Sequence, residues 1–152
     1  MQANPNTNTQ STDLDHAFRT LSTKLHSLGC VFVDHYNGQP ERSVDHVYSW
    51  PAAFIEFQAL RWEQPRGRIV TAQGSLSLHL IQQHLGDSYT TAQGTQAGRP
   101  RFALVEQVQR GLHNWKPEGF GYLLLAGTQP ARLWNQLLAD VLSYRFEYRR
   151  CL

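Results

Sequence analysis

The segment from residue 138 to residue 149 alternates between apolar and polar side chains over most of its length. The apolar positions are Leu142, Tyr144, Phe146 and Tyr148, and the polar positions between them are Ser143, Arg145, Glu147 and Arg149. Successive side chains of a strand point to opposite faces of a sheet, so the pattern predicts a strand that is buried on one face only. No catalytic motif accompanies this strand in the sequence. The pattern therefore favours a structural protein built around a sheet over an enzyme.

An amphipathic helix is predicted from residue 13 to Gly29. Residues 11–13 supply side chains suited to a helix N-cap, and Gly29 is suited to the position just after a helix. The apolar residues recur at spacings of three and four, namely Leu14, Phe18, Leu21, Leu25 and Leu28. We expect this helix to cover one face of the sheet. Residues 1–12 contain no aliphatic side chain large enough to anchor them, which predicts a disordered N-terminal arm.

Further strands follow from shorter apolar patterns. Residues 30–36 are compatible with a short strand before the turn signal Asn37-Gly38, and residues 53–57 form a second strand that could extend to Trp62. Residues 75–80 alternate cleanly, and residues 122–126 are apolar. We expect loops over residues 63–73 and 86–101, the second of which is long enough to indicate function or disorder.

A second helix is predicted over residues 102–112, where Phe102, Val105, Val108 and Leu112 form one apolar stripe. Strands joined by short connections favour antiparallel pairing. The predicted fold class is therefore α+β, with a mainly antiparallel sheet of about four strands and two helices packed on one face. The length of 152 residues fits one domain, which we place at residues 13–152.

The charge of the chain gives weak evidence about partners. The formal net charge is +2, charged residues make up 17% of the chain, and no run of Lys or Arg marks a nucleic-acid-binding stripe. We also expect no membrane contact, because the N-terminus lacks a signal peptide pattern and no apolar run approaches the ~20 residues of a membrane span. Candidate interaction residues are the arginines of the two loops and of the last strand, namely Arg66, Arg68, Arg99, Arg101, Arg145, Arg149 and Arg150.

Catalytic and metal-binding motifs are absent from the sequence. HExxH, a His-Cys cluster, GxSxG, a P-loop and GxGxxG do not occur. His79 and His84 lack the spacing of a metal site, and Ser77 with His79 lacks an orienting acid. We therefore predict no catalytic residues, no metal and no cofactor. Cys30 and Cys151 match no redox motif, and nothing in the sequence requires a disulfide between them.

The order of elements resembles a known family. The helix of residues 13–29 is followed by the strand Trp50-Pro51-Ala52-Ala53-Phe54-Ile55-Glu56-Phe57 and by Gln73-Gly74-Ser75-Leu76-Ser77-Leu78-His79-Leu80. The helix of residues 102–112, the strand of residues 122–126 and a last strand introduced by Leu138-Ala139-Asp140 complete the order. Over residues 13–149 this layout resembles the tail terminator and tail completion proteins of long-tailed bacteriophages.

The resemblance implies a structural role in the virion. Such proteins form a ring, commonly a hexamer, on the finished tail tube, stop tube polymerisation and present a surface to the head-neck connector, with no catalytic step. The implied partners are further copies of the chain, the tail tube protein and the head-tail connector protein. The implied location is the tail-neck region, after assembly in the host cytoplasm. Arg145, Arg149 and Arg150 would make non-specific contact with passing DNA if they faced the lumen of the ring.

The sequence leaves three alternatives open. The chain could be another neck or minor tail component with the same small fold. It could be a small-ligand-binding or enzymatic domain with a pocket under residues 86–101, which a deep polar pocket would favour. It could also be a nucleic-acid-binding module, whose affinity for DNA would depend strongly on salt.

Overall fold

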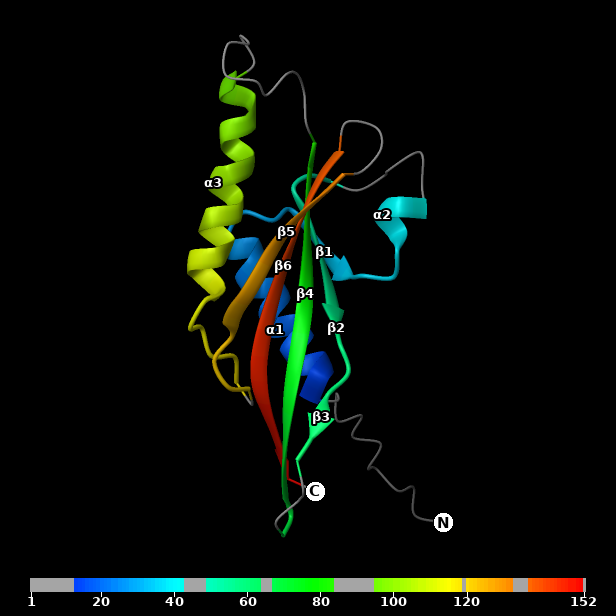
Figure 1. Ribbon diagram of the computed structural model, residues 1–152, viewed down its shortest axis with the longest axis vertical. Coiled ribbons are helices and arrows are strands. Elements are labelled where there is room, and N and C mark those ends of the chain that lie inside the picture. Colours follow the sequence, from blue (N-terminus) through cyan, green and yellow to red (C-terminus); the bar gives the residue numbers. More distant parts are fainter. Residues whose placement is uncertain are drawn as a thin grey trace, which may run out of the picture.

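The computed structural model describes residues 13–42, 49–63, 67–83, 95–118, 120–132 and 137–151. It confirms the α+β class, because a single sheet packs against two long helices (Figure 1). These helices are α1 (Asp13–Ser27) and α3 (Thr95–Leu112), and a one-turn helix α2 (Gln39–Arg42) lies beside the sheet. The predicted N-terminal arm of residues 1–12 lies outside the described residues, and the single-domain prediction for residues 13–152 stays a prediction.

The sheet is larger than predicted, with six described strands in place of about four. Its order is β1-β2-β4-β6-β5, with β3 beside β4. All neighbours are antiparallel except β1 and β2, which are parallel. A parallel pair needs a crossover connection, and residues 36–51 supply its length. The strands are β1 (Phe32–His35), β2 (Ala52–Phe57), β3 (Arg61–Trp62), β4 (Ile69–Gln83), β5 (Leu124–Arg132) and β6 (Leu137–Cys151).

The strands β4 and β6 form the centre of the sheet, and each has 15 residues. They pair without interruption from Ile69 opposite Cys151 to Gln83 opposite Leu137. The prediction of a loop over residues 63–73 is therefore wrong for residues 69–73. Gly74 weakened the strand pattern there, but a glycine is needed: a Cβ at this position would lie 2.6 Å from the Phe146 ring.

Two other predicted boundaries are also corrected. Helix α3 begins at Thr95, so residues 95–101 are helical and not part of a loop; Gly98 and Pro100 are weak helix formers and concealed this turn. Strand β5 runs over residues 124–132 instead of 122–126, and it contains Pro130. Proline is tolerated there because β5 is an edge strand.

Both long helices cover the same face of the sheet, which we call the covered face. Phe18 of α1 stacks on His35 of β1 with ring centroids 3.6 Å apart, and Gln109 of α3 donates a hydrogen bond of 2.9 Å to Thr128 of β5. The main core lies between them. Its sheet residues include Ile55, Leu76, Leu78, Leu80, Leu142, Tyr144, Phe146 and Tyr148, and its helix residues include Leu21, Leu25, Leu104, Val105, Val108 and Leu112.

The opposite face, which we call the open face, has a small apolar cluster at one end only. Ala52, Phe54, Ile81, Leu137 and Ala139 are buried there, with Phe32, Tyr36 and Trp50 packed against them. The rest of the open face carries the polar half of the β4 and β6 alternation, as the sequence predicts. None of the described helices is long and apolar enough to cross a membrane.

Candidate interaction surface

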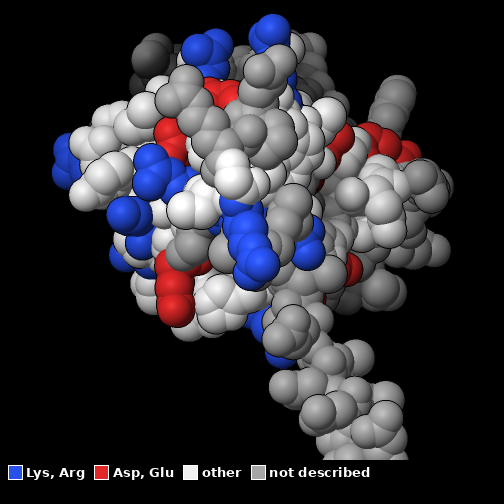
Figure 2. Space-filling model, turned by 90° about the horizontal axis from the view of Figure 1, so that it is seen from below, with Lys and Arg blue, Asp and Glu red and all other residues white. Residues whose placement is uncertain are grey.

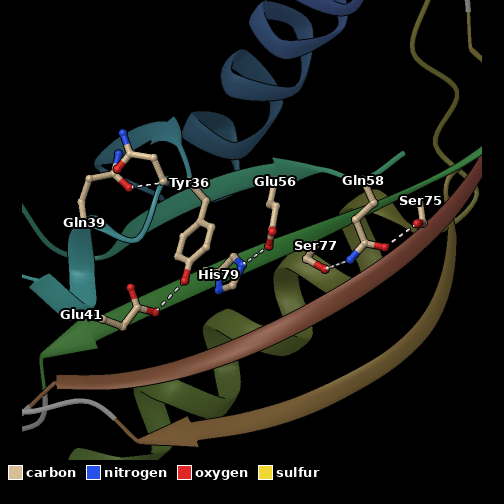
Figure 3. Close-up of polar contacts among 9 residues, drawn as sticks. Tyr36, Gln39, Glu41, Glu56, Gln58, Ser75, Ser77 and His79 are labelled. Carbon is tan, nitrogen blue, oxygen red and sulfur yellow. Dashed lines mark hydrogen bonds and ion pairs between the residues drawn. The ribbon is translucent and has the colours of Figure 1, made fainter. Parts of the chain in front are cut away.

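The middle of the open face carries polar side chains that bond to one another (Figure 3). The Ser75 hydroxyl donates to Gln58 Oε1 at 2.6 Å, and Gln58 Nε2 donates to the Ser77 hydroxyl at 3.1 Å. Ser77 is almost fully buried. The buried Ser77 hydroxyl therefore has a hydrogen-bond partner within the protein, and the three side chains form one connected polar row.

A second polar group continues this row towards β1. His79 Nε2 lies 2.9 Å from Glu56 Oε2, and the Tyr36 ring stacks on the His79 ring with centroids 3.9 Å apart (Figure 3). The Tyr36 hydroxyl donates to Glu41 Oε1 at 3.0 Å and so connects α2 to the sheet. These contacts connect the segment after β1 and helix α2 to the sheet through Tyr36 and His79.

A groove opens on the open face where the chain before β5 lies beside β6, with Phe120 opposite Tyr148. Gly121 N donates to Glu147 O at 2.6 Å, and Asn114 takes a left-handed backbone conformation with φ of 60°. The groove has a volume of about 770 Å³. We call it the β6 groove, and it is lined by Gln73, Asn114, Lys116, Phe120, Gly121, Tyr122, Leu124, Arg145, Phe146, Glu147 and Arg149.

The β6 groove combines a positive charge with exposed apolar side chains. Arg149 Nε lies 2.9 Å from Glu147 Oε1, so these two charges largely offset each other. Arg145 is exposed and forms no ion pair with a described carboxylate, while Lys116 lies over the Tyr122 ring at 5.7 Å from its centroid. Tyr122 is 57% exposed. The groove is therefore suited to a ligand that brings both a carboxylate and an apolar group.

The lower end of the sheet in Figure 1 carries further cations. Arg61 lies opposite Gln73, and Arg149 and Arg150 lie opposite the start of β4. Figure 2 looks onto this end and shows Lys and Arg side chains gathered over it beside scattered Asp and Glu. Trp62 is 48% exposed and contacts Tyr148 edge to face. This end thus offers an aromatic ring among arginines, a composition common in protein interfaces.

The predicted interaction arginines occupy several separate places. Register puts Arg145 and Arg149 on the open face, whereas Arg150 pairs with Val70 and lies on the other face of β6. Arg68 is exposed in the turn before β4. Arg99 and Arg101 lie in the first turns of α3, and their side chains are not described; Arg66 lies outside the described residues. The grouping of Arg145, Arg149 and Arg150 on one lumen-facing surface is thus not supported by the register.

The alternation of residues 75–80 predicted that Ser77 and His79 share the polar face, but it gave no sign that His79 meets Glu56. Their contacts depend on the pairing of β2 with β4, which local patterns do not specify. The β6 groove was also missed, because residues 114–121 gave only the signal of a break between the second helix and the next strand. The pocket considered under residues 86–101 involves residues 86–94, which lie outside the described residues.

No group of three or more His, Cys, Asp or Glu side chains among the described residues could hold a metal ion. Cys30 is a buried free thiol, and burial raises its pKa to about 11. A thiol with a raised pKa is a poor nucleophile at neutral pH, so Cys30 belongs to the core.

Comparisons with known proteins give a likeness in fold. No protein-family model and no curated protein sequence matches the chain. Among solved structures, a chain described as "Virion of native gene transfer agent (GTA) particle" superposes with a TM-score of 0.51. The match covers 87% of this chain and 93% of that chain at 12% sequence identity. At this identity the likeness shows a shared fold.

Proposed function

We propose that this chain is a structural virion protein of a bacteriophage-like particle, with a role like that of a tail terminator. The fold likeness carries the proposal, because it covers nearly all of both chains and the similar structure is a virion. The order of sequence elements, which resembles the tail terminator family, supports it independently. In this role the chain forms a ring on the finished tail tube, ends its polymerisation and joins the tube to the head-neck connector.

The surface of the molecule suits assembly better than catalysis. The polar side chains of the open face bond to one another instead of converging on a ligand. Exposed large apolar side chains among the described residues occur before β1 (Val31), at β3 and the start of β4 (Trp62 and Ile69), on α3 (Phe102) and in the β6 groove (Tyr122 and Leu124). Several contact surfaces on one small domain suit a protein that meets neighbours on more than one side. We infer a non-enzymatic role in which the partners are further copies of this chain, a tail tube protein and a connector protein.

A second candidate is another neck or minor tail component. The similar solved structure is described only as a virion, which does not assign a position within the particle. Both candidate roles are in the virion. They differ in whether this chain controls the length of the tail, which only the terminator role requires. Contact with passing DNA remains a part of either proposal, through the exposed Arg145 and Arg149.

Deletion of the coding sequence in the producing host separates these roles. A terminator role predicts tails of uncontrolled length without heads in electron micrographs, and a plasmid copy of the wild-type chain restores uniform tails. Another neck component predicts tails of normal length beside unattached heads. Complete particles with normal tails after the deletion would overturn both roles.

A further inference from the structure

The two edges of the sheet carry opposite charge on the open face. At the β1 edge the described acidic side chains are Asp34 of β1 and Glu41 of α2, and Glu56 on the neighbouring β2 contacts His79. No described Lys or Arg side chain lies among residues 30–41 and 49–58. On the β5 side, the β6 groove presents Arg145 and Lys116 without a described acidic partner.

Exposed apolar side chains accompany both charged surfaces. Val31, directly before β1, is 57% exposed, and Asp34 follows it three residues later. In the β6 groove, Tyr122 and Leu124 are 57% and 47% exposed beside the two cations. The groove accepts a partner that brings a carboxylate and an apolar side chain. The β1 edge of the same chain supplies both, with Asp34 on the open face of β1 and Val31 directly before the strand.

The outer edge of β1 is capped by side chains near its end. His35 N donates to Asp34 Oδ1 at 2.8 Å, and His35 O accepts a hydrogen bond of 2.7 Å from Gln39 Nε2. A strand edge whose backbone groups are occupied does not readily add a further strand. A neighbouring molecule at this edge is therefore contacted through side chains. A groove lined by Lys116 and Arg145 would make contacts of this kind.

We propose that the β1 edge of one copy docks into the β6 groove of a second copy, with Val31 on Tyr122 and Leu124, and Asp34 facing Arg145 and Lys116. The strands β1 and β5 are the two edges of the sheet (Figure 1), and the groove lies on the β5 side, where it is lined by β6 and Leu124. The contact is thus head-to-tail, and repetition gives a ring when the rotation closes. The inference rests on the proposed function in taking self-assembly as the role of the chain, and it names the surfaces that make the contact.

Reciprocal charge reversal tests this contact. The solution mass of full-length wild type, Arg145→Glu and Asp34→Arg is measured by light scattering over a concentration series at low salt. Each single variant should weaken self-association by roughly tenfold or more, because like charges then face each other. An equimolar mixture of the two variants should restore assembly, since Asp34 of one variant meets Arg145 of the other and Arg at position 34 meets Glu at position 145.

Arg68→Glu is the matched control, because it makes the same charge change at an exposed arginine that does not line the β6 groove. It should assemble like wild type. Urea unfolding midpoints should agree for wild type, Arg145→Glu and Arg68→Glu, since both arginines are exposed. Asp34→Arg should unfold at a slightly lower urea concentration, because it loses the hydrogen bond from His35 N. Assembly by Arg145→Glu at wild-type strength would overturn the contact, even if its affinity for duplex DNA fell.

Two other outcomes also overturn the contact. Weak assembly of both single variants that the mixture does not restore would show that Arg145 and Asp34 face different partners. A wild-type chain that stays monomeric at every concentration would show that the two surfaces do not bind each other. Neither result decides the proposed function, because the tail length after gene deletion is an independent measurement.

Discussion

The covered and open faces of the sheet are formed by alternate residues of β4 and β6, yet they differ in burial and in their contribution to stability. Leu142 and Tyr144 on the covered face are fully buried, whereas Arg145 and Arg149 on the open face are exposed. Full burial of one large aliphatic side chain stabilises a fold by about 1.5–3 kcal/mol, while a net hydrogen bond contributes about 0.5–1.5 kcal/mol. Stability therefore comes mainly from one face, and the other is available for contacts.

The largest expected effect comes from neighbouring residues on β6. Leu142→Ala removes a fully buried side chain from the main core and should lower the free energy of unfolding by about 2–5 kcal/mol. Ser143→Ala changes the next residue, which lies on the open face opposite Ser77, and should stay within about 0.5 kcal/mol of wild type. Urea unfolding measures both. Similar losses in the two variants would show that the faces do not differ in this way.

A close approach inside the covered face gives the next effect. Gly74→Val places side-chain atoms against the Phe146 ring and Leu60, where even a Cβ would lie 2.6 Å and 2.7 Å from the nearest atoms. Overpacking of this kind costs about 1–3 kcal/mol in unfolding free energy.

The control for Gly74→Val is Gly127→Ala on the edge strand β5. A Cβ at Gly127 meets no atom within 4 Å, so this variant should unfold at about the wild-type urea concentration. If Gly74→Val were as stable as Gly127→Ala, the close contact between β4 and β6 at this point would be absent in solution.

Alkaline pH should lower the free energy of unfolding through the buried thiol of Cys30. Burial raises the pKa of this thiol from 9.0 to about 11, so the unfolded chain loses the proton first as the pH rises. The contribution is therefore complete below pH 9 and is lost as the pH rises towards 11, by about 1 kcal/mol at pH 10. Urea unfolding of wild type and Cys30→Ala at pH 8 and pH 10 measures it. Equal pH dependence in both proteins would assign the loss to other groups.

The division into two faces could be predicted from the sequence because it is a local property. The alternation of residues 138–149 placed Leu142 and Arg145 on opposite faces, and the apolar spacing with Gly29 gave α1 within two residues at its end. Helix periodicity and strand alternation depend on neighbours along the chain, so one sequence is enough to find them.

The pairing of the strands could not be predicted in the same way. The parallel position of β1, the contact of His79 with Glu56 and the groove beside Arg145 all depend on residues far apart in sequence. The start of β4 was hidden for a related reason, because Gly74 is a poor strand residue until the Phe146 ring covers it. The contacts that form the candidate interaction surface are therefore contacts between distant residues, which local sequence patterns do not predict.

The smallest expected changes in unfolding free energy have opposite signs on the two faces. The Tyr144 hydroxyl is buried and has no hydrogen-bond partner among the described residues, and burial raises the pKa of this side chain. Tyr144→Phe removes an unsatisfied polar group at nearly constant shape and should raise the free energy of unfolding by up to about 1 kcal/mol. Ser77→Ala on the open face removes a hydroxyl that accepts from Gln58 Nε2, and it should lower that free energy by about 0.5–1.5 kcal/mol.

The sign of the difference, measured by urea unfolding, is the sharpest test of the comparison. A gain for Tyr144→Phe with a loss for Ser77→Ala means that polar atoms are unfavourable on the covered face and satisfied on the open face. A loss for Tyr144→Phe would show that its hydroxyl is bonded in solution. The covered face would then contain a polar contact, and the stability of the sheet would depend less on apolar burial alone.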